Sequence, residues 1–186
     1  MSVRFGLTIL CLLISFPAAG EEADYVLVGG DIPVAAASNG YAQIVRPVAE
    51  GGVEVRVATT LAPIGAGGTY ADVVKGARPK VPDGFQLPQR LQIELRRDLS
   101  AWQAATLILE WAANNIAVDV NDVNAQDAIS VLNRGRGRCS GLANAAVALL
   151  RAAGFEARTV SGLLVGDERV VPHRWIECQL PGAGWV

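Results

Sequence analysis

The stretch from residue 139 to residue 182 constrains the fold of this 186-residue chain most strongly. Apolar residues recur at helical spacing over 139–153, and Gly154 follows where a left-handed C-terminal cap is expected. Two predicted strands come next, over 157–165 and from about 170 to 182, with Gly166-Asp167-Glu168 as the turn between them. The chain must therefore form a domain that contains both helices and strands. This layout can bring a side chain at the start of the helix close to one on the second strand.

Two chemically reactive residues occupy these two places. Cys139 opens the predicted helix, and His173, the only histidine of the chain, lies 34 residues later on the second strand. A thiol is a strong nucleophile as the thiolate, and a neighbouring imidazole is the usual base that produces it. The unpaired N–H groups and the dipole of a helix N-terminus favour a thiolate and could bind a developing oxyanion. Cys139 is therefore a candidate nucleophile and His173 a candidate base, with an inert buried cysteine and a structural histidine as the alternatives.

The residues around Cys139 support the same interpretation. Arg136 and Arg138 add positive potential beside the thiol. Gly135, Gly137 and Gly141 lack side chains, and we expect them to let the backbone of a substrate come close.

Alternation along the second strand sorts its side chains into two faces. His173, Trp175 and Glu177 share one face, and Arg174, Ile176 and Cys178 share the other. If His173 faces Cys139, then Cys178 points away from it, so we expect both thiols to be free. Glu177 could orient the imidazole, but four residues separate the two and we expect a structural or substrate-side role for it.

The first 20 residues have the pattern of a secretory signal peptide. A short basic start up to Arg4 precedes an apolar run over 5–16, and small residues at 17–20 stand ahead of Glu21. The apolar run is shorter than the about 20 residues that a membrane span needs. We therefore expect a secreted or periplasmic protein without a stable membrane anchor; a retained anchor helix is the alternative.

The remaining chain divides into three parts. Residues 21–60 form a β-rich N-terminal segment, in which residues 53–57 alternate with period two. Residues 61–87 are a connector rich in proline and glycine. Beyond it, Ser100 and Gln103 form a capping box for a helix that continues to about residue 114. A short helix over about 126–133 is expected to direct Ile129 and Leu132 inward.

Composition excludes several classes of function. The formal net charge of −2 lacks the basic excess of a nucleic-acid-binding protein. One histidine and the two cysteines outside the signal peptide cannot make a structural zinc site. A glycine-rich phosphate loop with its lysine is absent from the sequence. We therefore expect no nucleic-acid partner, no metal and no cofactor.

Five blocks of sequence together resemble a known family. They are Gly137-Arg138-Cys139-Ser140-Gly141-Leu142-Ala143, Leu149-Leu150-Arg151-Ala152-Ala153-Gly154-Phe155-Glu156-Ala157-Arg158, Val160-Ser161-Gly162, His173-Arg174-Trp175-Ile176-Glu177 and Pro181-Gly182-Ala183-Gly184-Trp185-Val186. Over about residues 88–186 the chain is similar to the core of the bacterial transglutaminase-like cysteine peptidase superfamily. The resemblance implies an α+β, papain-like fold in which the nucleophile heads a helix packed on an antiparallel sheet. It also implies that Cys139 is the nucleophile and His173 the base.

The sequence departs from the family pattern at two positions. The family places an aspartate that orients the histidine shortly after the Gly-Trp-Val segment, beyond Val186. Members often carry an aromatic residue where Val118 stands. The leading hypothesis is an exported thiol-dependent acyl-transfer enzyme that hydrolyses or transamidates amide bonds of a peptide or protein substrate. The alternative is a non-catalytic binding or scaffold module, or a truncated inactive product that lacks the aspartate of the triad.

Overall fold

The computed structural model describes residues 10–12, 20–28, 33–60, 68–76, 79–165 and 170–186. Two compact units make up the chain, residues 1–64 and residues 65–186. Most of the predicted signal peptide and the predicted turn at 166–168 lie outside the described residues. No helix in the described part of the chain has the length and apolar character to cross a membrane.

The first unit is an antiparallel sheet of five strands, as far as its residues are described, with the order β1-β2-β5-β4-β3. Its strands are β1 (Leu10–Leu12), β2 (Gly20–Val28), β3 (Ala36–Ser38), β4 (Tyr41–Pro47) and β5 (Gly52–Thr60), with a short 3₁₀ turn at Ala49–Gly51. The predicted alternation holds on β5, where Val53 and Val55 are buried. Arg56 of β5 pairs with Asp24 directly opposite on β2, at 2.7 Å. Strand β1 lies inside the predicted signal peptide.

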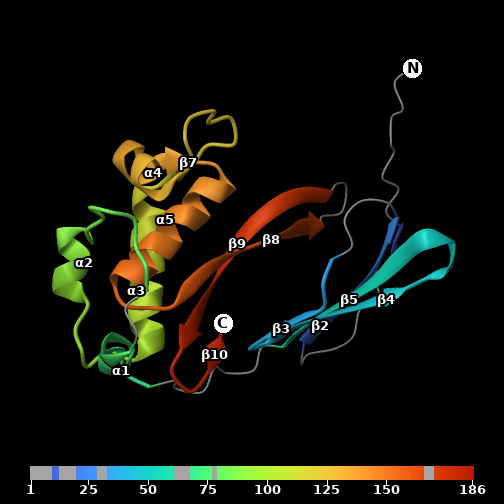
Figure 1. Cartoon of the computed structure of the whole chain (residues 1–186), viewed down its shortest axis with the longest axis horizontal. Helices are drawn as coiled ribbons and strands as arrows, with labels where there is room; N and C mark the ends of the chain where they lie inside the picture. Colours follow the sequence, from blue (N-terminus) through green and yellow to red (C-terminus); the bar gives the residue numbers. More distant parts are fainter. Residues whose placement is uncertain (1–9, 13–19, 29–32, 61–67, 77–78, 166–169) are drawn as a thin grey trace. The chain divides into compact units, whose positions relative to one another are not determined.

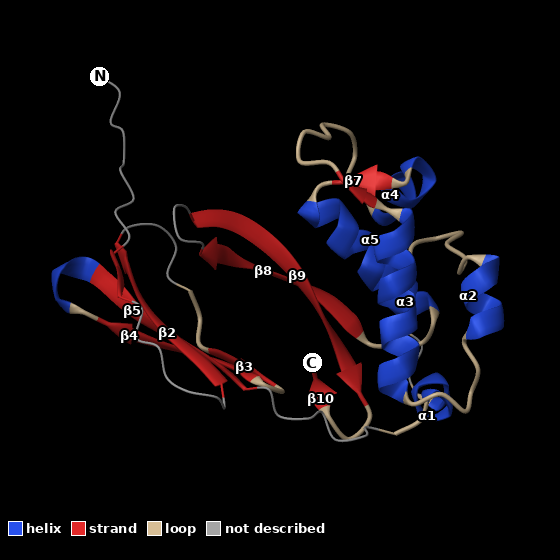
Figure 2. Cartoon of the chain, turned by 180° about the vertical axis from the view of Figure 1, so that it is seen from behind, coloured by secondary structure: helices blue, strands red, loops and turns tan. Residues whose placement is uncertain are grey.

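The second unit combines helices with an antiparallel hairpin (Figures 1 and 2). Its helices are α1 (Tyr70–Lys75), α2 (Gln89–Glu94), α3 (Ala101–Asn115), α4 (Ala128–Arg134) and α5 (Cys139–Ala152). Its strands are β6 (Ala117–Val118), β7 (Arg136–Gly137), β8 (Ala157–Val165), β9 (Val170–Leu180) and β10 (Gly184–Trp185). Helix α5 contacts α3 and α4 as well as β8 and β9, so it lies at the centre of this unit. The α+β fold with a helix packed on an antiparallel sheet is confirmed.

Local sequence explains how the central elements begin and end. The predicted capping box is present, since Ser100 Oγ accepts a hydrogen bond from the Gln103 N–H and Gln103 Oε1 accepts one from the Ser100 N–H, both at 3.0 Å. Gly154 has a φ of 99°, which terminates α5 as predicted. The core that α5 shares with the sheet contains side chains of at most 1% exposure, including Leu149, Leu150, Phe155, Ala157 and Leu180.

Helix α1 lies inside the predicted connector, and the sequence analysis did not anticipate it. Thr69 and Asp72 form a capping box at its start. Tyr70 is buried, donates a hydrogen bond from its hydroxyl to the Ala153 carbonyl at 2.8 Å, and stacks on Phe155. Residues from 65 onward therefore belong to the second unit. A helix of six residues is too short to produce a recognisable apolar period.

The prediction for the short helix before Cys139 was wrong about its inward face. Helix α4 buries Ala128 and Val131, whereas Ile129 is 39% exposed. Asp127 caps the helix by accepting a hydrogen bond from the Ser130 N–H, so the helix begins later than predicted. Val131 then faces the start of α5, where its methyl groups approach Gly137 and Gly141.

Candidate active site

Cys139 is the first residue of α5, where the sequence predicted it. Its thiol is free and half-buried. The preceding residue, Arg138, makes no side-chain cap for the helix. The first N–H groups of a helix have no partner within it and carry its positive dipole end. The thiol therefore stands beside donors that could bind an anion developing next to it.

Gln126 holds the start of α5 in place, and the sequence analysis missed it. Its side-chain oxygen, Oε1, accepts a hydrogen bond from the backbone N–H of Arg138 at 2.8 Å. Its backbone carbonyl accepts a second bond from Asn144 Nδ2, also at 2.8 Å. Gln126 thus contacts α5 on both sides of Cys139 in the sequence. No local pattern could reveal these contacts, because they join a loop to a helix 12 and 18 residues away.

The glycines near Cys139 serve packing, which corrects the expectation that they open the site to a substrate backbone. Gly137 is buried, and a Cβ there would lie 3.1 Å from both Gln126 Oε1 and Val131 Cγ2. A Cβ at Gly141 would overlap Gln126 Oε1 and lie 2.8 Å from Val131 Cγ2. Gly135 has a φ of 65° and forms the left-handed C-cap of α4. The glycines allow α4, α5 and the Gln126 loop to come together.

A buried carboxylate fixes this loop. Asp122 is 4% exposed and accepts hydrogen bonds from the Asn124 N–H, Asn124 Nδ2, Gln126 Nε2 and Arg134 Nη2 at 3.0, 2.6, 3.0 and 2.8 Å. The pKa of Asp122 lies well below its usual range, and the hydrogen bond from the Asn124 N–H is the largest cause. The side-chain hydrogen bonds lower this pKa further, whereas burial raises it. Asp122 is therefore ionised at neutral pH and organises the loop before α4.

His173 lies on β9 opposite Gly162 of β8. Its ring meets the ring of Trp175 edge-on, with centroids 5.0 Å apart. Trp175 in turn covers Gly162, where a Cβ would lie 2.8 Å from the indole. His173, Trp175 and Gly162 thus share one face of the hairpin, and the strand alternates as predicted.

The opposite face of the hairpin contacts α5. Cys178 is 4% exposed and pairs with the buried Ala157, and burial raises the pKa of the Cys178 thiol to about 11. Thr159, on the same face, lines a groove together with residues of α5. Near Cys178 the face that carries His173 therefore points away from α5. Within the described residues, no hydrogen bond joins the Cys139 thiol to the His173 ring.

Of the two roles expected for Glu177, structural or substrate-side, the structure shows a structural contact. It pairs with Arg158, its direct neighbour on β8, at 2.8 Å. The Arg158 guanidinium also covers the ring of Trp185 at 4.2 Å from its centroid. The two contacts of Arg158 join β8 to β9 and to β10, and the Glu177 carboxylate is paired with Arg158.

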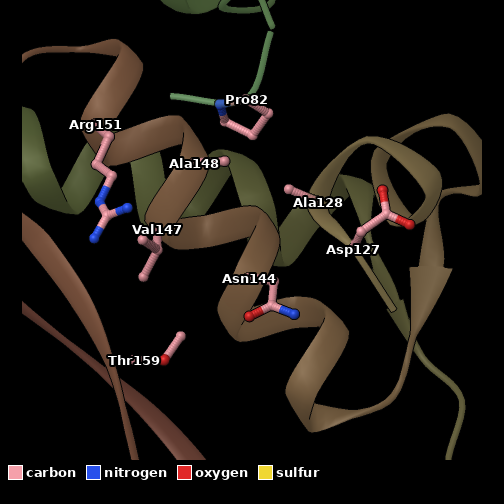
Figure 3. A pocket seen from close by; sticks show the side chains of 8 residues that line it. All are labelled: Pro82, Asp127, Ala128, Asn144, Val147, Ala148, Arg151 and Thr159. Carbon is pink, nitrogen blue, oxygen red and sulfur yellow. The ribbon is translucent and has the colours of Figure 1, made fainter. Parts of the chain in front are cut away.

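A groove of about 300 Å³ runs along α5 (Figure 3). It is lined by the residues Pro82, Asp127, Ala128, Asn144, Val147, Ala148, Arg151 and Thr159. Asn144, whose amide binds the Gln126 carbonyl, is the lining residue nearest to Cys139 in the sequence. The described residues contain no group of three or more side chains that could hold a metal ion.

The family of the chain follows from comparison with known proteins. The profile of the transglutaminase-like superfamily matches residues 89–186, which include α2 to α5, β8, β9 and both candidate site residues. The chain belongs to the transglutaminase-like superfamily.

Among solved structures, a candidate cysteine protease from Cytophaga hutchinsonii has a similar fold, with a TM-score of 0.51 and 16% identity over 96% of this chain and 68% of that chain. The papain-like, transglutaminase-like fold class is thereby confirmed. No curated protein matches the sequence.

Proposed function

We propose that this protein is a thiol-dependent acyl-transfer enzyme that hydrolyses, or transamidates, amide bonds of a peptide or protein substrate. The observation that carries the proposal is the place of Cys139, a free thiol at the first residue of α5, inside the part of the chain that matches the superfamily. The catalytic roles of Cys139 and His173 are part of this proposal.

In the proposed reaction, the Cys139 sulfur attacks the carbonyl carbon of the substrate as a thiolate, with the thiol proton held on His173. The N–H groups of the first turn of α5 stabilise the oxyanion. The carbon–nitrogen bond then breaks, His173 gives its proton to the leaving amine, and a thioester remains on Cys139. Water, or a second amine, loses a proton to His173 and attacks the thioester, which releases the acyl group and restores the thiolate.

The proposal requires the imidazole of His173 to reach the thiol when substrate binds. Catalytic hydrogen bonds are often long or poorly aligned without substrate and tighten in the complex. The ring of His173 is half-buried, and its described neighbour is the Trp175 ring. A ring contact of this kind contributes about 1 kcal/mol. Because the face of β9 that carries His173 points away from α5 near Cys178, the proposal also requires β9 to turn this face toward the thiol when substrate binds.

Turnover of a fluorogenic peptide library by the full chain tests the proposal. Cys139→Ala removes the nucleophile and is expected to abolish turnover, whereas Cys178→Ala removes a buried thiol on β9 and is expected to retain it. Turnover by Cys139→Ala at the wild-type rate would contradict the proposal.

A non-catalytic binding module is the second candidate function. The lack of a hydrogen bond between Cys139 and His173 among the described residues favours it. It predicts that the chain binds a peptide from the same library without cleaving it, and that Cys139→Ala binds that peptide equally well.

We also propose that the protein is exported and that residues 1–20 are removed. The support is the sequence pattern of these residues, a basic start, a short apolar run and small residues at 17–20. N-terminal sequencing of the protein recovered outside the cytoplasm of an expressing bacterium is expected to begin at Glu21. Recovery of the full-length chain in the cytoplasm alone would contradict export.

A further inference from the structure

We infer that Gln126 is the positioning residue of the nucleophile: it fixes the first turn of α5, while the ion pair of Asp122 and Arg134 fixes Gln126. Its meaning for catalysis rests on the proposed function. Gln126 is not among the residues that line the groove along α5, and it acts through the backbone that carries Cys139.

Two hydrogen bonds attach Gln126 to the beginning of α5. The first joins its Oε1 to the N–H of Arg138, the residue immediately before Cys139. The second joins its carbonyl to the side chain of Asn144, which follows Cys139 by little more than one helical turn. The segment that carries the thiol is therefore held from both ends by one residue.

The side-chain amide of Gln126 has only one orientation that satisfies its partners. Its Nε2 donates to Asp122 Oδ2 at 3.0 Å and to the Asn124 carbonyl at 2.9 Å, so its Oε1 must face α5. Asp122 Oδ2 is held in turn by Arg134 Nη2 at 2.8 Å. A carboxylate in place of the amide could accept from Arg138 but could not donate to Asp122.

The packing around Gln126 leaves little room for movement. A Cβ at Gly137 of β7 or at Gly141 of α5 would meet both Gln126 Oε1 and a methyl group of Val131, which is fully buried. A displacement of the reacting groups by about 1 Å can cost about 100-fold in rate. Loss of the Gln126 contacts would free the first turn of α5 to shift by such a distance, together with the thiol and the N–H groups beside it.

The test compares Gln126→Met, which keeps the length but removes both polar atoms, with Ser100→Ala, which removes the cap of α3 and none of the hydrogen bonds of Gln126. Both variants are made in the full chain with Cys11→Ser and Cys178→Ala, so that Cys139 is the one thiol left to react. Melting temperature, the rate of Cys139 alkylation by iodoacetamide at pH 7, and peptide turnover are measured. Gln126→Met is expected to slow alkylation by about tenfold and to lower kcat by about 10- to 100-fold with little change in KM. Ser100→Ala is expected to lower the melting temperature alone.

Alkylation of folded Gln126→Met at the unmodified rate, or faster, would overturn the inference. If Gln126→Met does not fold, Gln126→Asn, which keeps the amide but withdraws it by one methylene, takes its place with the same expectation. If the unmodified chain cleaves no peptide, the proposed function fails, but the alkylation rates still decide whether Gln126 positions the thiol.

Discussion

Substitution of Gly141 by alanine sets two physical effects against each other. Gly141 lies inside the first turn of α5, where alanine is favoured over glycine by about 1 kcal/mol. Propensity alone therefore predicts a more stable protein. The structure predicts the reverse, because the added methyl group would overlap Gln126 Oε1 and lie 2.8 Å from Val131 Cγ2.

The expected magnitude follows from what must move. A free glutamine side chain could swing aside, but the amide of Gln126 is held by Arg138 and Asp122. Overpacking costs about 1–3 kcal/mol, and breaking one internal hydrogen bond costs about 1 kcal/mol more. After the gain in helix propensity, we expect Gly141→Ala to lower the free energy of unfolding by about 2 kcal/mol.

Urea denaturation followed by tryptophan fluorescence measures this change, because all four tryptophans lie in the second unit. The matched control is the same substitution in a Gln126→Ala background, where the overlap with the Gln126 side chain is removed and only the contact with Val131 Cγ2 remains. In the Gln126→Ala background we expect Gly141→Ala to lower the free energy of unfolding by at least about 1 kcal/mol less than it does in the unmodified chain. A Gly141→Ala protein as stable as the unmodified one, or equal costs in both backgrounds, would refute the reasoning.

Three further predictions concern stability. Tyr70→Phe leaves the buried carbonyl of Ala153 without its hydrogen-bond donor, so we expect the free energy of unfolding, measured by urea denaturation, to fall by about 1–2 kcal/mol. An unchanged free energy of unfolding would show that this hydrogen bond does not anchor α1. Burial raises the pKa of the Cys178 thiol from about 9 to about 11, so the contribution of this thiol to stability is present below pH 9 and is lost as the pH rises to 11. We expect the free energy of unfolding to fall by about 2–3 kcal/mol over this interval. In Cys178→Ala we expect a smaller fall. Because the pKa of Asp122 is lowered, its carboxylate contributes stability above about pH 4, and this contribution is lost on further acidification. We therefore expect Asp122→Asn to be less stable at pH 7 and less sensitive to acid. A free energy of unfolding that falls with acid as steeply in Asp122→Asn as in the unmodified chain would contradict this.

Elements with a strong local signal could be predicted from the sequence. The start of α5 at Cys139, the capping box of Ser100 and Gln103, and the bounds of β8 all follow from caps, periodicity and turn residues within a few positions. Helix α1 could not be predicted, because its stability comes from the contacts of Tyr70 with Ala153 and Phe155, more than 80 residues away.

The candidate site shows the same division. Cys139 and His173 stand out by residue type and place, whereas Gln126 and Asp122 look like ordinary polar loop residues. Their role arises from tertiary contacts with Arg134, with the Arg138 backbone and with Asn144. The missing side chains of Gly137 and Gly141 predict a close approach by substrate, and only the position of Gln126 reveals that these glycines are needed for packing.

The pH dependence of Cys139 alkylation, with and without His173, tests the central claim most directly. The measurement uses iodoacetamide and the full chain carrying Cys11→Ser and Cys178→Ala, compared with the same chain carrying His173→Ala as well. The account predicts rapid labelling that persists well below pH 8, and labelling slowed by about tenfold or more at pH 7 when His173 is removed. Labelling that rises only near pH 8.5, as for an ordinary thiol, and equally in both proteins, would contradict an active Cys139–His173 pair.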